Sequence, residues 1–129
     1  MSRRSGRGGA WALACRILAW TLLAALVAFT LAPIGYRPAT AAPASVERFC
    51  AFAALALLFA LGHPRRRWRV LVLTIAAAAA LEAMQALSPS RHGRALDFAV
   101  KAAGCGLGTA LALALSAVGR LRPRPDRPG

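Results

Sequence analysis

Four long apolar runs divide this sequence and limit what it can fold into. A helix that crosses the hydrocarbon core of a bilayer needs about 20 mostly apolar residues, or roughly 17 at the short end. Four segments rich in Ala, Leu and Val meet this requirement: residues 11–32, 46–62, 70–87 and 96–118. None of them shows the alternation of polar and apolar residues that barrel strands need. We therefore predict an all-α fold, an integral membrane bundle of four antiparallel transmembrane helices.

Prolines, which end helices, follow each of the first three apolar runs. They are Pro33, Pro38, Pro43, Pro64 and Pro89. Connections this short join antiparallel neighbours. The sequence therefore predicts a basic N-terminal segment at residues 1–10, a four-helix transmembrane domain at residues 11–118, and a disordered basic tail at residues 119–129, where Arg and Pro alternate.

The composition supports a membrane location. With 58% hydrophobic and 16% charged residues, the chain is too apolar for an ordinary soluble domain. Its 17 Lys and Arg against 4 Asp and Glu would otherwise suggest a nucleic-acid partner. Because these basic residues lie between apolar runs, we expect membrane lipids as partners and no nucleic acid.

The three cysteines, Cys15, Cys50 and Cys105, each lie within an apolar run. No CxxC motif and no Cys/His grouping accompanies them, so the sequence supports neither a disulfide framework nor a zinc site. We expect free thiols that pack inside the protein, and no metal ion or other cofactor.

Arginines near the ends of the apolar runs predict the orientation of the chain, because positive residues are retained on the cytoplasmic side. The N-terminus, the second connection and the C-terminal tail carry most of them: Arg3, Arg4, Arg7, Arg65, Arg66, Arg67, Arg69, Arg120, Arg122, Arg124 and Arg127. The other two connections carry fewer: Arg37, Arg48, Arg91 and Arg94. We therefore expect both termini to be cytoplasmic. Arg16 lies inside the first run, close enough to that face to reach the interface as an anchor.

The first run could instead belong to a cleavable signal peptide, with residues 39–41 as the cleavage site. A signal peptide has an apolar core of about 7 to 15 residues. The first run is longer than that, so we expect it to be retained as a span.

Four polar side chains interrupt the third and fourth runs: Glu82, Gln85, Asp97 and Lys101. A charge at mid-bilayer costs about 2.5 kcal/mol or more, so each needs a reason. Glu82 and Gln85 share one helix face, and Asp97 and Lys101 share another. Glu82 and Lys101 lie at about the same depth, so they could pair between the two helices.

Gly104 and Gly108 form a GxxxG motif on the same face as Asp97 and Lys101. Small residues also flank Glu82: Ala78, Ala79 and Ala86. Because small residues let helix backbones approach closely, we expect the two glycines to pack on this small-residue side of the third helix.

Two interpretations of these polar groups remain open. They could form a structural ion-pair network that fixes the register of the third and fourth helices. Alternatively, Glu82, Gln85 and Asp97 could line an outward-facing polar pocket, with Arg91 or Arg94 above it to hold a phosphate or carboxylate. His92, which has no second His or Cys nearby, is expected to be a solvated loop residue.

The same residues resemble the VanZ-like family of small membrane proteins. The family pattern is a Glu, a Gln three residues on, an Arg in the short loop, an Asp opening the last helix, and two glycines four apart within it. The matching residues here are Glu82, Gln85, Arg91, Asp97, Gly104 and Gly108. The segments Ala-Pro-Ile-Gly-Tyr-Arg-Pro, which contains Arg37, and Glu47-Arg48-Phe49 also resemble signatures of proteobacterial members.

Three positions qualify the resemblance. The family commonly has an Asn where this chain has Lys101, and often an Asp followed closely by a His where this chain has Glu47. Arg94 could take the place of Arg91 as the family arginine, although the six-residue spacing from Arg91 to Asp97 favours Arg91.

The resemblance implies a multi-pass cell-envelope protein in a bacterial inner membrane. The family is named for a protein of glycopeptide-resistance clusters that is associated with teicoplanin resistance, and such a role is not carried over automatically. The ligand-binding candidates are Glu82, Gln85, Arg91, Asp97, Lys101, Arg94, Arg37 and Glu47.

Three classes of function fit these observations. We favour a non-enzymatic protein that binds an anionic lipid or a lipid-linked precursor at the outer leaflet. An intramembrane enzyme acting on a lipid-linked phosphate or glycan is the second class, with Glu82 or Asp97 as acid or base and Arg91 gripping phosphate. A small assembly partner of a larger envelope complex is the third.

The arginine bias can be checked with reporter fusions. We expect alkaline phosphatase to be active when fused after Arg94 and silent when fused after Arg67, because its disulfides form only outside the cytoplasm. The reverse pattern of activities would overturn the predicted orientation.

Overall fold

The structure, a computed structural model, describes residues 3–32, 41–87 and 95–121. Four helices make up most of these ranges: α1 Arg3–Leu31, α2 Ala44–Gly62, α3 Arg67–Ala86 and α4 Ala95–Leu121. No strand occurs within the described ranges. Each of the four helices is long and apolar enough to cross a membrane. The predicted all-α bundle is confirmed, and the chain is a multi-pass membrane protein.

The helices extend beyond the predicted apolar runs at both ends of the chain. α1 begins at Arg3, well before the predicted start at Trp11, and α4 continues past Val118 to Leu121. An apolar run marks the part of a helix that can cross the membrane, and not the residues at which the helix begins and ends. The remainder of the predicted C-terminal tail, residues 122–129, lies outside the described residues.

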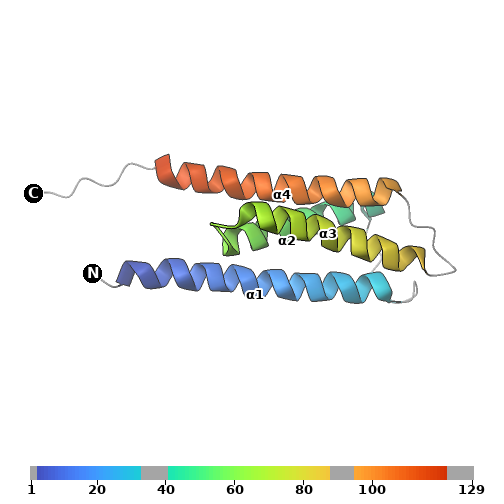
Figure 1. The fold of residues 1–129 in the computed structure, drawn as a ribbon, viewed down its shortest axis with the longest axis horizontal. Coiled ribbons are helices and arrows are strands. Elements are labelled where there is room, and N and C mark those ends of the chain that lie inside the picture. Colours follow the sequence, from blue (N-terminus) through green and yellow to red (C-terminus); the bar gives the residue numbers. More distant parts are fainter. Residues whose placement is uncertain (1–2, 33–40, 88–94, 122–129) are drawn as a thin grey trace, which may run out of the picture.

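The four helices lie side by side along one long axis, with both termini at the same end of the bundle (Figure 1). α1 and α4 form the two outer edges in this view, and α2 and α3 lie between them. At the end that holds the termini, α1 and α4 extend past the turn between α2 and α3 (Figure 1). This up-and-down arrangement brings the start of α2, the end of α3 and the start of α4 together at the opposite end.

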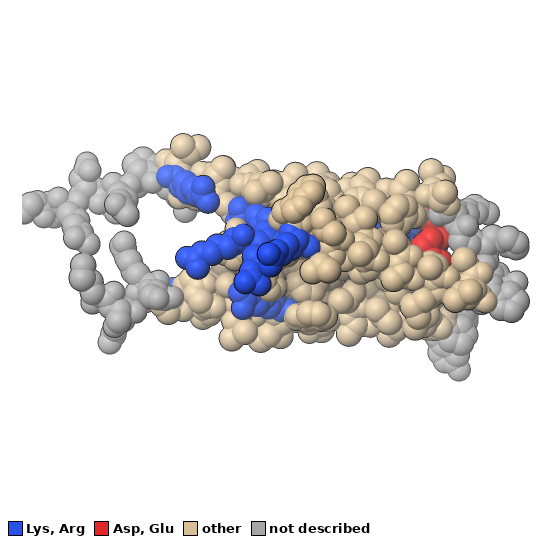
Figure 2. Space-filling model, viewed as in Figure 1, with Lys and Arg blue, Asp and Glu red and all other residues tan. Residues whose placement is uncertain are grey.

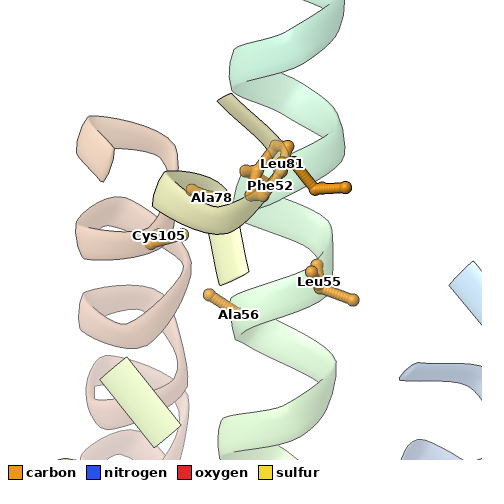
Figure 3. Packing of buried hydrophobic residues seen from close by; sticks show 6 residues of the cluster. All are labelled: Phe52, Leu55, Ala56, Ala78, Leu81 and Cys105. Atoms are coloured by element: carbon orange, nitrogen blue, oxygen red, sulfur yellow. The ribbon is translucent and has the colours of Figure 1, made fainter. Parts of the chain in front are cut away.

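The core lies where α2, α3 and α4 meet (Figure 3). Its buried members are Phe52, Leu55, Ala56, Ala78, Leu81 and Cys105. Many large apolar side chains instead cover the outside, such as Leu73, which is 68% exposed. Lipid tails are as apolar as leucine, so this surface needs no protein cover, and close packing of small residues holds the helices together.

α2 and α4 share the most extensive contact in the bundle. A Cβ added at Gly104 would lie 2.5 Å from the carbonyl oxygen of Phe49, and one at Gly108 would lie 2.1 Å from that of Ala53. Real Cβ atoms essentially never come so close to other atoms, so these positions require glycine. The predicted packing of these glycines on the third helix is therefore wrong, because they face α2. Spacing along α4 identifies a face but not the helix that covers it.

Arg16 joins α1 to the end of α2. Its Nε donates a hydrogen bond of 2.7 Å to the carbonyl oxygen of Gly62, the last residue of α2. The final carbonyls of a helix lack partners within the helix, so this bond satisfies one of them. An arginine expected only to anchor the chain at the interface therefore also caps a neighbouring helix.

The cysteines follow the prediction in part. All three thiols are free, and Cys15 and Cys105 are buried as expected for packing groups. Cys50 is exposed, so its predicted packing inside the protein is wrong. An apolar run shows that a residue lies in the membrane, but not whether it faces protein or lipid.

The glycine contacts predict a contrast within one helix. We expect Gly104→Ala and Gly108→Ala to lower the thermal stability of the protein in detergent, because each new Cβ would collide with a backbone oxygen of α2. Overpacking of this kind costs about 1–3 kcal/mol. Gly106→Ala is the matched control, since its Cβ would meet nothing within 4 Å and Ala favours helix by up to about 1 kcal/mol. Gly119→Ala, equally open, is a second control. Equal losses at all four sites would contradict the close-contact explanation.

Candidate functional site

Polar side chains gather at the end of the bundle opposite the termini. This polar end consists of Glu47, Arg48, Glu82, Gln85, Asp97 and Lys101, which come from the start of α2, the end of α3 and the start of α4. The sequence has four acidic residues, and three of them lie here. Figure 2 shows acidic groups near this end, whereas Lys and Arg gather over the turn between α2 and α3 towards the other end. The two ends of the bundle therefore differ in charge.

Lys101 and Glu82 form a buried ion pair between α4 and α3. The Nζ atom of Lys101 donates to Oε2 of Glu82 at 2.7 Å, and the side chains are only 4% and 12% exposed. The same Nζ lies 5.9 Å from the ring centroid of Phe52, which adds a cation–π attraction. The expected pairing of these two residues is present. It neutralises the only lysine of the chain in a low-dielectric region, where an unpaired ammonium would be costly.

A second ion pair joins the start of α2 to the start of α4. Nη1 of Arg48 lies 2.8 Å from Oδ2 of Asp97, and the side chains are 32% and 24% exposed. Arg48 was not among the candidate residues, because its position suggested only a topological role. A signal in the sequence could have identified it: α2 and α4 both start on the same side of the membrane, and residues near their starts carry opposite charges.

A cavity of about 320 Å³ lies beside the buried ion pair. Its apolar lining comes from α1 and α2: Leu26, Phe29, Ala44, Ala51 and Phe52. Its polar lining is Thr30, Glu47, Arg48, Gln85 and Lys101. An acyl chain and a polar headgroup could therefore both find matching walls here.

Glu47 is the unusual member of this lining. Its Oε1 is shielded from solvent and accepts no hydrogen bond within the described part of the chain. Leaving a buried acceptor without a donor costs about 1–3 kcal/mol. A ligand that brings a hydroxyl or amine group to this oxygen would recover that free energy.

The structure brings together only some of the predicted site residues. Glu47, Gln85 and Lys101 line one cavity, and Glu82 holds the ammonium of Lys101. Asp97, which the sequence grouped with Glu82 and Gln85, pairs with Arg48 and is not part of the cavity lining. The three remaining candidates and the neighbouring histidine lie outside the described residues: Arg37, Arg91, Arg94 and His92.

No group of three or more His, Cys, Asp or Glu residues that could hold a metal ion occurs in the part of the chain that the structure describes. Comparison with known proteins finds no matching family, no similar curated protein and no similar solved structure.

A double-mutant cycle tests the buried ion pair of Glu82 and Lys101. Glu82→Gln should destabilise the protein by about 3–5 kcal/mol, because it leaves the ammonium of Lys101 buried without a countercharge. Adding Lys101→Asn should restore most of that loss. Asp97→Asn is the matched control, since its pair is partly exposed and such pairs contribute about 0–1 kcal/mol.

Thermal or denaturant unfolding in detergent measures all four proteins of the cycle. A double variant as unstable as Glu82→Gln alone would contradict the coupling between the two charges.

Proposed function

We propose that this chain is a VanZ-like envelope protein that binds a lipid-linked precursor through the cavity at its polar end. The observation that carries the proposal is the shielded oxygen of Glu47, which accepts no hydrogen bond from the described residues and lies in a cavity with both polar and apolar walls. The proposed ligand has a polyprenyl chain, a phosphate link and a headgroup rich in hydroxyl and amide groups.

The charges of the polar end favour such a headgroup over a simple anionic lipid. Within the described residues, the two cations Arg48 and Lys101 are already paired with carboxylates. Glu47 leaves this set with one excess negative charge and one free acceptor. A hydroxyl or amide N–H can donate to that acceptor, whereas a bare phosphate would be repelled by it.

The phosphate link requires cations from elsewhere. The sequence has Arg37 between α1 and α2, and Arg91 and Arg94 between α3 and α4. Both connections start from helix ends at the polar end of the bundle. In the proposal these guanidinium groups bind the phosphate by charge-assisted hydrogen bonds, while the headgroup reaches Glu47 and Gln85.

We further propose that the polar end faces the outside of a bacterial inner membrane, with both termini in the cytoplasm. The support is the distribution of arginines, which are concentrated at the termini and at the turn between α2 and α3. A precursor exposed at the outer leaflet would then meet the cavity directly. The proposal is for a binding protein and includes neither an enzymatic step nor a role in glycopeptide resistance.

Native mass spectrometry of the full-length protein in detergent tests this function. The probes are an undecaprenyl-diphosphate-linked muropeptide, undecaprenyl phosphate and phosphatidylglycerol, added separately. We expect the muropeptide lipid to bind most tightly. Glu47→Gln should weaken it by roughly five- to tenfold, the difference between hydrogen bonds to charged and neutral acceptors.

Asp126→Asn is the control, because it removes the one carboxylate of the sequence that does not belong to the polar end. It should leave the affinity for the muropeptide lipid nearly unchanged. Unaltered binding by Glu47→Gln, or equal binding of undecaprenyl phosphate and the muropeptide lipid, would refute the proposed role of Glu47.

A further inference from the structure

A second and larger cavity lies at the other end of the bundle, near the turn between α2 and α3. Its volume is about 470 Å³, within the range of about 300–1,000 Å³ that is usual for ligand pockets. α2 forms its floor through Leu55 and Phe59, while α1 and α3 form its walls. Because α1 and α3 contact each other only slightly, the cavity is a groove between them. We call it the basic groove.

The walls of the basic groove are apolar over most of their length. α1 contributes Trp20 and Leu23, and α3 contributes Val70, Leu73 and Ala77. Trp20 and Leu73 are 61% and 68% exposed, so they form the rim rather than a closed core. The one hydroxyl in the lining, that of Thr74, already donates within its own helix. An apolar groove on a membrane-spanning bundle matches an acyl chain in its chemistry.

Three cationic or titratable groups lie at the end of the groove nearest the turn: His63, Arg66 and Arg69. Both arginines are exposed, and no Asp or Glu belongs to the described lining. Nδ1 of His63 lies 3.0 Å from the carbonyl oxygen of Phe59 and therefore carries the donated proton, which leaves Nε2 for another partner. These groups offer positive charge and hydrogen-bond donors at the membrane interface.

The groove is held open by contacts that do not use its own arginines. Arg16 fixes α1 to the end of α2 through the carbonyl oxygen of Gly62. Trp20, one turn further along α1, packs edge-on against Phe59, with ring centroids 5.3 Å apart. Arg66 and Arg69 form no ion pair within the described residues, so they are available to a ligand.

We infer that the basic groove binds one glycerophospholipid with an anionic headgroup. One acyl chain lies along Leu23, Phe59 and Leu73, and the phosphate accepts hydrogen bonds from Arg66 and Arg69. Guanidinium groups suit this task because they hold phosphate in a bidentate geometry. A second copy of this chain would fit poorly, because it would bring the same basic end against these arginines.

This inference concerns a different end of the molecule and different residues from the function proposed above. A loss of phospholipid binding would therefore leave the muropeptide binding intact, and the reverse also holds. Glu47→Gln should not change the affinity for phosphatidylglycerol.

Binding to the purified full-length protein in detergent tests the inference, with phosphatidylglycerol as the probe and phosphatidylcholine of the same acyl chains as the neutral comparison. Native mass spectrometry counts bound lipid, and size-exclusion chromatography with circular dichroism confirms that each variant is folded. The first variant is Arg66→Gln with Arg69→Gln. Its matched control is Arg65→Gln with Arg120→Gln. This pair removes two exposed charges from the same end of the bundle, and neither residue lines the groove.

We expect the wild type to prefer phosphatidylglycerol and the Arg66 and Arg69 double variant to lose that preference. An arginine near an anionic surface contributes a factor on the order of fivefold, so the loss should be roughly 25-fold. The control pair should retain most of the affinity. Equal losses in both double variants would show a general effect of surface charge and overturn the site.

A second pair of variants tests the acyl chain separately. Ala77→Phe should fill the groove and reduce binding of both lipids, whereas Ala80→Phe, on the exposed surface of α3 outside the groove, should not. Unchanged binding by Ala77→Phe would overturn the acyl-chain assignment. Dimerisation of the wild-type protein through the basic groove would displace any lipid bound there. A dimer that forms through the groove without releasing lipid would therefore overturn the inference as a whole.

Discussion

The backbone contact between α2 and α4 is the constraint on which the rest of the structure depends. Gly104 and Gly108 let the two helices approach until a single added Cβ would collide with a carbonyl oxygen. Lys101 lies three residues before Gly104 on the same face of α4, so this contact carries its ammonium into the interior. Glu82 on α3 neutralises that charge. The ion pair and the cavity beside it are thus consequences of how closely two helices can pack.

The buried pair of Lys101 and Glu82 fixes the register of α3 against α4 more than it adds net stability. Two charges removed from water recover their desolvation cost only when the geometry is good, and an apolar pair of the same volume is often as stable. A shift of α3 along α4 by one turn, about 5.4 Å, would separate Lys101 from Glu82 and remove the countercharge of the buried ammonium. The partly exposed pair of Arg48 and Asp97 constrains the helix register much less, because water can solvate either group when the pair opens. Alignment of α3 therefore depends on Glu82.

Hydropathy and the distance of a residue from the end of its span predicted more of this fold than the spacing of residues on one helix face did. The four spans follow from run length alone, and the Glu82 and Lys101 contact follows from their similar distance to the span ends. The helix that covers Gly104 and the partner of Asp97 did not follow. Spacing along one helix shows which residues share a face, but the neighbouring face depends on how all four helices pack. The exposed Cys50 has the same explanation, because an apolar run does not distinguish residues that face lipid from residues that face the protein interior.

The linings of the two cavities come within one turn of each other on α2, at Phe52 and Leu55, but their charged groups lie towards opposite ends of the bundle. Glu47 and Gly62, the last residue of α2, are 15 residues apart, which is about 22 Å along the helix axis and nearly three times the Debye length of about 8 Å at physiological salt. Exposed charges at one end thus hardly influence ligand choice at the other. The carboxylate oxygen of Glu47, which has no donor among the described residues, would favour a ligand with hydrogen-bond donors, whereas Arg66 and Arg69 would favour phosphate. If both proposals hold, these charged groups act near opposite ends of the spans, so their energetic effects should be additive, and one small bundle would present a different headgroup preference to each leaflet.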